Sequence, residues 1–115
     1  MNESIRVLVA EQPEHVVVSA YGLLYFDTLQ PLHDALLPQV GRDRPRVILD
    51  LGAVQQCDSS GLNLFVKAHR LAGDHGGWFR IAAPRPAVRR LLDLTNLSRV
   101  LRIFDSVQQA ANQPG

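Results

Sequence analysis

The sequence has a single cysteine, no long apolar run and almost no net charge, and each scarcity excludes a class of protein. Cys57 alone cannot form an internal disulfide, which fits a reducing compartment. The apolar runs are too short to span a membrane, and a net charge of +1 gives no strong field towards nucleic acid. Met1–Ser4 have neither a basic region nor an apolar signal core. We therefore predict a cytoplasmic protein that binds neither nucleic acid nor membrane.

Motifs for metal binding, nucleotide binding and hydrolysis are also missing. The four histidines show no zinc-like spacing with Cys57 or with one another. The sequence has no Walker-type glycine loop and no Gly-x-Ser-x-Gly elbow. We predict no metal site, no cofactor and no catalytic activity. A minor hydrolase that uses Ser59 or Ser60 is a rival hypothesis, and it would need a histidine placed beside the hydroxyl.

Composition and length fit one globular domain over residues 1–115, with 46% apolar and 20% charged residues. The charge is unevenly distributed. Residues 1–41 have five acidic side chains against one arginine, a net −4, and residues 76–115 have six arginines against two aspartates, a net +4. This pattern is typical of two solvated faces, and it would also orient a charged partner.

Apolar periodicity predicts strands that alternate with helices after an initial hairpin. The order β-β-α-β-α-β-α-β-α predicts an α/β fold, with a mixed sheet of about five strands and about four helices on one side of it. The predicted strands are 5–10, 15–21, 47–51, 78–83 and 100–104, and the predicted helices are 28–40, 59–72, 86–94 and 107–111.

One stretch carries the candidate chemistry, because a buried strand at 47–51 leads into a polar corner that opens a helix. Asp58, Ser59 and Ser60 are all residue types that cap helix N-termini, and an apolar helix follows at once. Two hydroxyls and a carboxylate are thus predicted at the positive end of a helix, at the exit of a central strand. In open α/β sheets, ligands and partners are usually met there. The neighbouring Cys57 is predicted to be a small buried side chain rather than a reactive thiol.

The stretch Cys57-Asp58-Ser59-Ser60-Gly61-Leu62, between a strand and an apolar helix, resembles the STAS domain, the fold of bacterial anti-sigma factor antagonists. Three further stretches match the family in the right order, and the likeness covers roughly residues 5–111. They are Gly22 followed by Asp27-Thr28 and a helix, the Gly76-Gly77 turn, and the helix and turn at 86–97. The Asp-Ser-Ser-Gly tetrapeptide alone is weak evidence, and its place after a buried strand makes it specific.

The resemblance implies a protein that binds an anti-sigma factor and thereby frees a sigma factor. In that family the anti-sigma factor is a serine kinase that supplies ATP and magnesium, and phosphorylation of the antagonist breaks the complex. Carried over to this sequence, Ser60 is the first choice as acceptor and Ser59 the second. Asp58 would orient the hydroxyl or the partner's metal-bound nucleotide, and the partner would contact Asp58 to Gly61.

The sequence departs from the family after the second predicted strand, where the family often has Gly-Glu-Leu-Asp. Here Gly22 is followed by the apolar residues Leu23, Leu24, Tyr25 and Phe26, and the first acid is Asp27. Alternate residues of this loop could be buried in the core. Alternatively, Leu23 to Asp27 form an exposed patch that docks a partner or a second copy, giving a homodimer. The departure favours an alternative function as a phosphorylation-independent STAS module, either a signalling scaffold or an accessory subunit of a lipid-transport complex.

Overall fold

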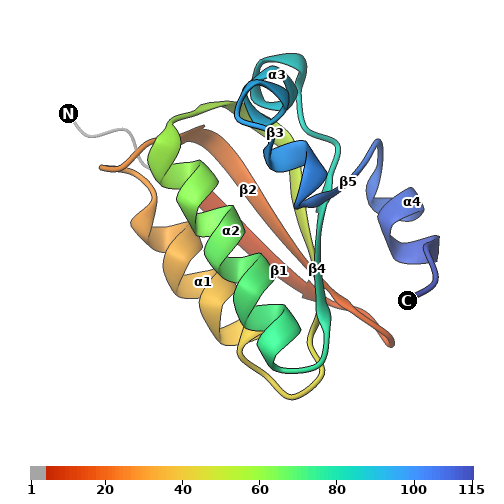
Figure 1. Ribbon diagram of the computed structural model, residues 1–115. Coiled ribbons are helices and arrows are strands. Elements are labelled where there is room, and N and C mark those ends of the chain that lie inside the picture. The colour runs from red at the N-terminus through yellow and green to blue at the C-terminus, as the bar shows by residue number, and fades with distance from the viewer. Residues whose placement is uncertain (1–4) are drawn as a thin grey trace.

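A five-stranded mixed sheet forms the centre of the computed structural model, which describes residues 5–115 (Figure 1). The prediction that Met1–Ser4 are not part of a signal sequence concerns residues outside this range. The strands are β1 (Arg6–Glu11), β2 (Val16–Leu24), β3 (Arg46–Cys57), β4 (Trp78–Ala82) and β5 (Arg102–Phe104). The helices are α1 (Gln30–Val40), α2 (Ser59–Asp74), α3 (Pro86–Leu94) and α4 (Val107–Asn112), with a 3-10 turn η1 (Leu97–Arg99) before β5. The predicted order of strands and helices is confirmed.

The strands lie in the sheet in the same order as in the chain, β1-β2-β3-β4-β5. The first two strands pair antiparallel because a short turn joins them, and every later pair is parallel because a helix separates its members along the chain. β3 therefore lies in the middle of the sheet. It is also longer than predicted, since strand structure continues to Cys57 through residues that the sequence placed in the polar corner.

The main core lies between one face of the sheet and the helices α1, α2 and α3. Because side chains alternate along a strand, Val47, Leu49 and Leu51 of β3 all point to this face, and each is at most 1% exposed. Phe65 of α2 is completely buried against them. This layer holds the N-terminus of α2 against the end of the central strand.

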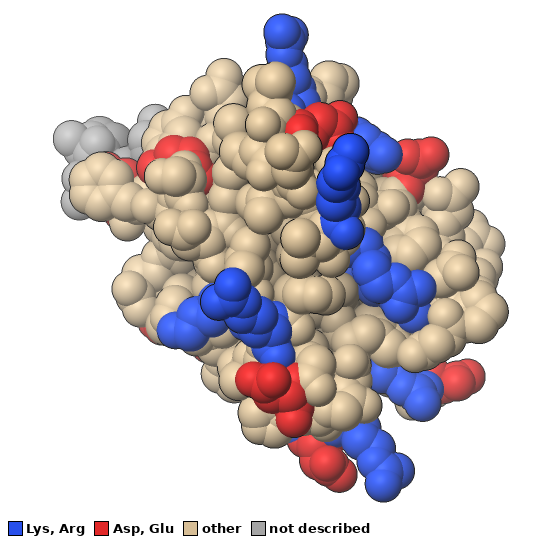
Figure 2. Space-filling view, in the orientation of Figure 1, with Lys and Arg blue, Asp and Glu red and all other residues tan. Residues whose placement is uncertain are grey.

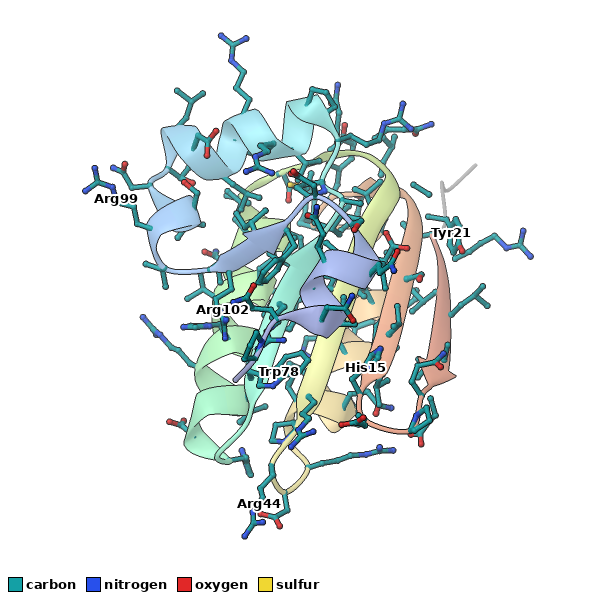
Figure 3. The ribbon with its side chains drawn as sticks, turned by 90° about the vertical axis from the view of Figure 1, so that its right-hand side faces the viewer. His15, Tyr21, Arg44, Trp78, Arg99 and Arg102 are labelled. Atoms are coloured by element: carbon teal, nitrogen blue, oxygen red, sulfur yellow. The ribbon has the colours of Figure 1, made fainter. Side chains whose placement is uncertain are left out.

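Helix α4 packs on the opposite face of the sheet, where Ile48, Ala82 and Ala110 form a second, smaller core. Figures 1 and 3 show α4 on the far side of the strands from α1 and α2. The predicted placement of the helices on one side thus holds for α1, α2 and α3 and not for α4. The reason is that apolar residues of β3 and β4 also point to this face and need cover of their own.

Arg80 on β4 is completely buried beneath the C-terminal segment. Its guanidinium donates hydrogen bonds to three main-chain carbonyl oxygens, at 2.8 Å to Ala110, 2.9 Å to Gln113 and 3.3 Å to Pro114. It also lies 3.7 Å from the centre of the Trp78 ring, within cation–π distance. Arg80 therefore fastens α4 and the residues after it to the sheet.

The charge of Arg80 is held by carbonyl oxygens and not by a carboxylate. Burial lowers the pKa of Arg80 to about 10, and the positive charges of Arg102 and Arg46 act in the same direction. A guanidinium with that pKa still carries its charge at neutral pH.

We expect Arg80→Met to lower the free energy of unfolding by about 2 to 4 kcal/mol, because it leaves buried carbonyl oxygens without a donor. Urea denaturation measures this change, and hydrogen exchange should show lost protection in α4 before the rest of the chain. Arg90→Met, at an exposed position of α3, is the matched control and should stay within about 0.5 kcal/mol of wild type. Equal stability of the two variants would contradict the role given to Arg80.

Candidate functional site

The carboxyl ends of β2 and β3 lie side by side, and this brings together the two stretches that the sequence singled out. Leu24 at the end of β2 is paired with Cys57 at the end of β3. The next residue, Asp58, donates its main-chain N–H to the Leu24 carbonyl at 3.1 Å. The apolar loop after β2 and the serine corner after β3 therefore form one continuous surface.

The carboxylate of Asp58 holds this surface together with three hydrogen bonds from main-chain N–H groups. It caps α2 by accepting from Ser60 at 2.9 Å and from Gly61 at 3.4 Å. Its other oxygen accepts from the N–H of Phe26 at 3.0 Å. The prediction that Asp58 caps the helix is confirmed, while its bond to the loop after β2 was not predicted. Both of its oxygens are engaged within the chain, which leaves less capacity to orient a hydroxyl or a metal-bound nucleotide.

Both serines lie in the first turn of α2, on the surface of the protein. Ser59 is exposed and Ser60 is half-buried. The following residue, Gly61, is buried against the strand ends, and a Cβ atom at that position would lie only 3.2 Å from Cβ of Cys57. Glycine thus allows the helix to begin close to β3 and leaves the serines at the rim.

The stretch from Leu23 to Asp27, predicted as a loop, begins with the last two residues of β2 and divides between the two alternatives that the sequence left open. Leu24 is fully buried in the core, whereas Phe26 is 77% exposed. Leu23 and Tyr25 are half-buried, and the Tyr25 hydroxyl donates to the side chain of Gln56 at 3.0 Å. A large aromatic side chain therefore lies exposed on the loop that Asp58 fastens to the serine corner.

Thr28 stabilises this loop from inside. Its buried hydroxyl accepts the N–H of Tyr25 at 2.9 Å and lies 2.6 Å from the Leu23 carbonyl, to which it donates. The prediction that Asp27 and Thr28 cap the next helix was wrong. Helix α1 begins at Gln30 without a side-chain cap, because the Thr28 hydroxyl is already used within the turn. Asp27 is exposed beside Phe26.

The Cys57 thiol is unreactive in this setting. The side chain is half-buried, and burial, with the nearby charge of Asp58 as a smaller cause, raises the pKa of Cys57 to about 11. Almost all of the thiol is therefore protonated at neutral pH. The sequence predicted a buried side chain, and the structure places Cys57 half-buried.

Within residues 5–115, no three His, Cys, Asp or Glu side chains are grouped so that they could hold a metal ion. None of the helices in that same range is long and apolar enough to cross a membrane.

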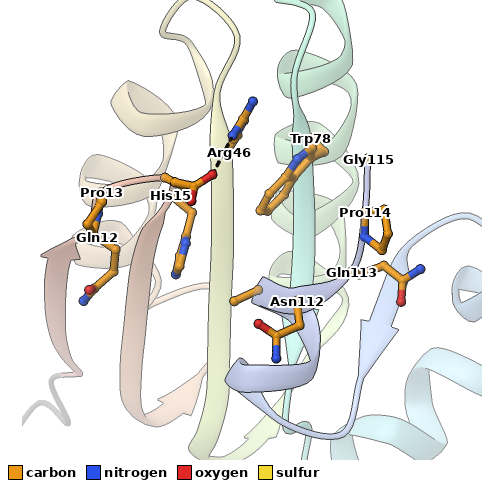
Figure 4. A pocket seen from close by; sticks show the side chains of 11 residues that line it. Gln12, Pro13, His15, Arg46, Trp78, Asn112, Gln113, Pro114 and Gly115 are labelled. Carbon is orange, nitrogen blue, oxygen red and sulfur yellow. Dashed lines mark ion pairs between the residues drawn. The ribbon is translucent and has the colours of Figure 1, made fainter.

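A groove of about 460 Å³ lies at the other end of β3 from the serine corner (Figure 4). At the usual rise per residue, the length of β3 separates the two by about 35 Å. The turn before β2 and the C-terminal residues Asn112 to Gly115 form its walls, and Trp78 lies at one side. Arg46 and Glu14 are 3.9 Å apart there and form a weak, exposed ion pair. None of the predicted site residues lines this groove.

Comparison with known proteins identifies the family of this chain and proteins that are similar to it. The sequence pattern of the STAS domain matches residues 6–110. A Thermotoga maritima protein provisionally named as an anti-sigma factor antagonist is 32% identical over 68 residues, or 59% of this chain and 60% of that protein. An anti-sigma F factor antagonist of Paenibacillus polymyxa is 31% identical over 72 residues, or 63% of this chain and 62% of that protein. The matched part thus covers less than two thirds of either relative.

Solved structures agree with this assignment. An anti-sigma factor antagonist from Mycobacterium paratuberculosis superimposes with a TM-score of 0.84 at 29% identity, covering 93% of this chain and 91% of that chain. The antagonist SpoIIAA in its unphosphorylated form has the same fold, with a TM-score of 0.75 at 16% identity, covering 93% of this chain and 94% of that chain.

We expect Asp58→Ala to lower the free energy of unfolding by about 1 to 2 kcal/mol, because α2 loses its cap and the loop after β2 loses its tether. Hydrogen exchange at the Phe26 amide should accelerate. Asp58→Asn is the informative control, since its carbonyl oxygen can still cap the helix while its NH₂ group cannot accept from Phe26. Its stability should lie between those of wild type and Asp58→Ala. An unchanged Phe26 exchange rate in Asp58→Ala would refute the tether.

Proposed function

The chain belongs to the STAS domain family, and on that basis we propose that it acts as an anti-sigma factor antagonist. It binds a serine-kinase anti-sigma factor in the cytoplasm and is released when that partner phosphorylates Ser60, with Ser59 as the second choice. The function is one of binding, and ATP and magnesium come with the partner. The observation that carries the proposal is a pair of accessible serines at the start of α2, beside a loop that Asp58 holds in place.

A phosphate on Ser60 would be tolerated by the domain itself. It adds about −1.5 to −2 charges at neutral pH, and the dipole at a helix N-terminus stabilises negative charge even though the N–H groups of Ser60 and Gly61 donate to Asp58. The cost therefore falls on the interface, where a surface that fits a neutral hydroxyl would have to desolvate a dianion. A coupling of about 3 kcal/mol weakens binding about a hundredfold, which lies within the usual range of such switches.

The partner surface that we propose extends from the serines to the loop after β2. Asp58, Ser59, Ser60 and Gly61 provide the corner, and Leu23 to Asp27 provide the adjoining edge. Exposed aromatic side chains on a fixed backbone are typical binding anchors, because little conformational entropy is lost when they are covered. Phe26 fits this description, since its own N–H is bonded to Asp58.

A phosphorylation-independent STAS module is the second candidate. The observation that favours it is the engagement of the Asp58 carboxylate by three main-chain donors, together with the absence of any acid between Gly22 and Asp27. A kinase would find fewer free carboxylates near Ser60 than the family pattern provides.

We expect mass spectrometry of the protein from its native cells to find phosphate on Ser60. Ser60→Ala should remove this phosphate, whereas Ser59→Ala should keep it. Ser59 is the matched control because it is the adjacent residue in the same helical turn and is the more exposed of the two. If no phosphate is present under any growth condition, the phosphorylation-independent module is the correct function.

We expect Phe26→Ala to weaken binding to the anti-sigma factor about tenfold or more, the effect typical of an interface anchor. The protein should stay folded because the side chain is 77% exposed. The measurement is the affinity of tagged wild type and variant for the partner purified from the same cells.

Leu8→Ala is a suitable control for Phe26→Ala. Leu8 lies on β1 and is 60% exposed. Its partner on β2 is Ser19, which is five residues before Leu24 at the end of that strand. Binding by the Leu8→Ala variant should remain within about twofold of wild type. A Phe26→Ala protein with wild-type affinity would remove the loop after β2 from the proposed interface.

A further inference from the structure

A second hollow, of about 330 Å³, lies between the C-terminal half of α2 and the strands β4 and β5, well away from the serine corner. It is lined by His69, Arg70 and Gly73 of α2, by Gly77, Trp78 and Phe79 where β4 begins, and by Arg102 of β5. Its volume is at the lower end of the range of small-molecule sites.

The hollow exists because β5 is short. Its first residue, Arg102, is paired with Arg80, so Trp78 and Phe79 extend beyond the end of β5 with no strand beside them on that edge. In Figure 3 Trp78 and Arg102 lie near each other on the edge of the sheet that borders α2. Of these two aromatic residues Trp78 is half-buried, whereas the Phe79 side chain is 1% exposed and belongs to the main core, so Trp78 supplies the accessible aromatic side chain at this edge.

The arginines of this hollow have no acidic partner. Within the described part of the chain, neither Arg70 nor Arg102 forms an ion pair or a side-chain hydrogen bond, and no acidic residue lines the hollow. Arg80 stacks on Trp78 immediately behind, and the charge of Arg102 contributes to its lowered pKa. Figure 2 shows Lys and Arg side chains on this face, with Asp and Glu side chains beside several of them. The guanidinium groups of Arg70 and Arg102 are therefore free to bind an anionic ligand, and the one acid of α2, Asp74, lies a helical turn beyond Arg70.

We propose that this hollow binds a small-molecule anion, one that has a phosphate or carboxylate group next to an apolar ring. The anionic group lies between the guanidinium groups of Arg70 and Arg102, which can each form paired hydrogen bonds to such oxygens. The ring packs against the accessible part of Trp78. This site is independent of the proposed switch at Ser60 and would give the domain a ligand of its own.

Trp78 is the only tryptophan of the chain, so its fluorescence reports on this hollow and on the groove at the end of β3, which it also lines. The probes are phenyl phosphate and benzoate, titrated into the full chain at constant ionic strength, with inorganic phosphate in a parallel titration. We expect a saturable change in Trp78 fluorescence with at least one of the two ring-bearing probes, and weaker binding of inorganic phosphate. The comparison of phenyl phosphate with benzoate identifies the preferred anionic group.

Arg70→Gln and Arg102→Gln should each raise the dissociation constant about tenfold or more, as expected for loss of a charged hydrogen-bond donor. Arg70 is exposed on a long helix, so Arg70→Gln keeps the test valid even if Arg102→Gln disturbs folding. Arg90→Gln removes the same charge from an exposed position on α3 and should leave the constant within about twofold.

Three results would overturn the proposal. One is the absence of saturable binding by both ring-bearing probes. Another is an equal loss of affinity in Arg90→Gln, because binding would then depend only on overall charge. The third concerns the groove at the end of β3, which Trp78 also lines together with Arg46. If Arg46→Gln abolishes binding while Arg70→Gln and Arg102→Gln retain it, the probe occupies that groove and not this hollow.

Discussion

The carboxylate of Asp58 is the constraint on which the candidate site depends. Its hydrogen bonds connect the end of β3 and the first turn of α2 to the loop after β2, in addition to the strand pairing of β2 with β3. A helix N-terminus needs acceptors for its free N–H groups, and Asp58 meets this need while it also holds the N–H of Phe26. One side chain thereby sets the position of the serine hydroxyls relative to an exposed aromatic ring. A partner that touches both meets a surface that is already ordered, so little entropy is lost on binding.

The opposite face of the sheet is organised by a buried cation. Arg80 lies where an apolar side chain would be expected, and the carbonyl oxygens at the end of α4 take the place of an acidic partner. Helix C-termini carry partial negative charge, so a guanidinium beneath α4 is favourably placed. No carboxylate neutralises Arg80, and its charge is held by these carbonyl oxygens alone. The hollow beside Trp78 is a consequence of the short β5.

Much of the site could be predicted because its elements follow one another in the sequence. A strand, an Asp-Ser-Ser-Gly corner and an apolar helix are local features, and local propensity places the serines in the first turn of α2. The bond between Asp58 and Phe26 could not be predicted in this way, since 32 residues separate the two and only strand pairing brings them together. Thr28 misled the prediction for a different reason, which is local. Its type suits a helix cap, but its hydroxyl bonds to the main chain of Leu23 and Tyr25 within the turn before α1.

The amino-acid sequence by itself determined the order of strands and helices, the mixed sheet and the corner that carries Ser59 and Ser60, because each depends on hydrophobic periodicity and on capping residues within a few positions of one another. Tertiary structure alone decided that α4 covers the far face, that Arg80 is buried under it, and that Phe26 remains exposed while Leu24 does not. These outcomes depend on which segments the strand pairing brings into contact. Whether a side chain is buried or exposed depends on neighbours that are distant in the chain. The pattern of residues within one segment carries no information about those neighbours.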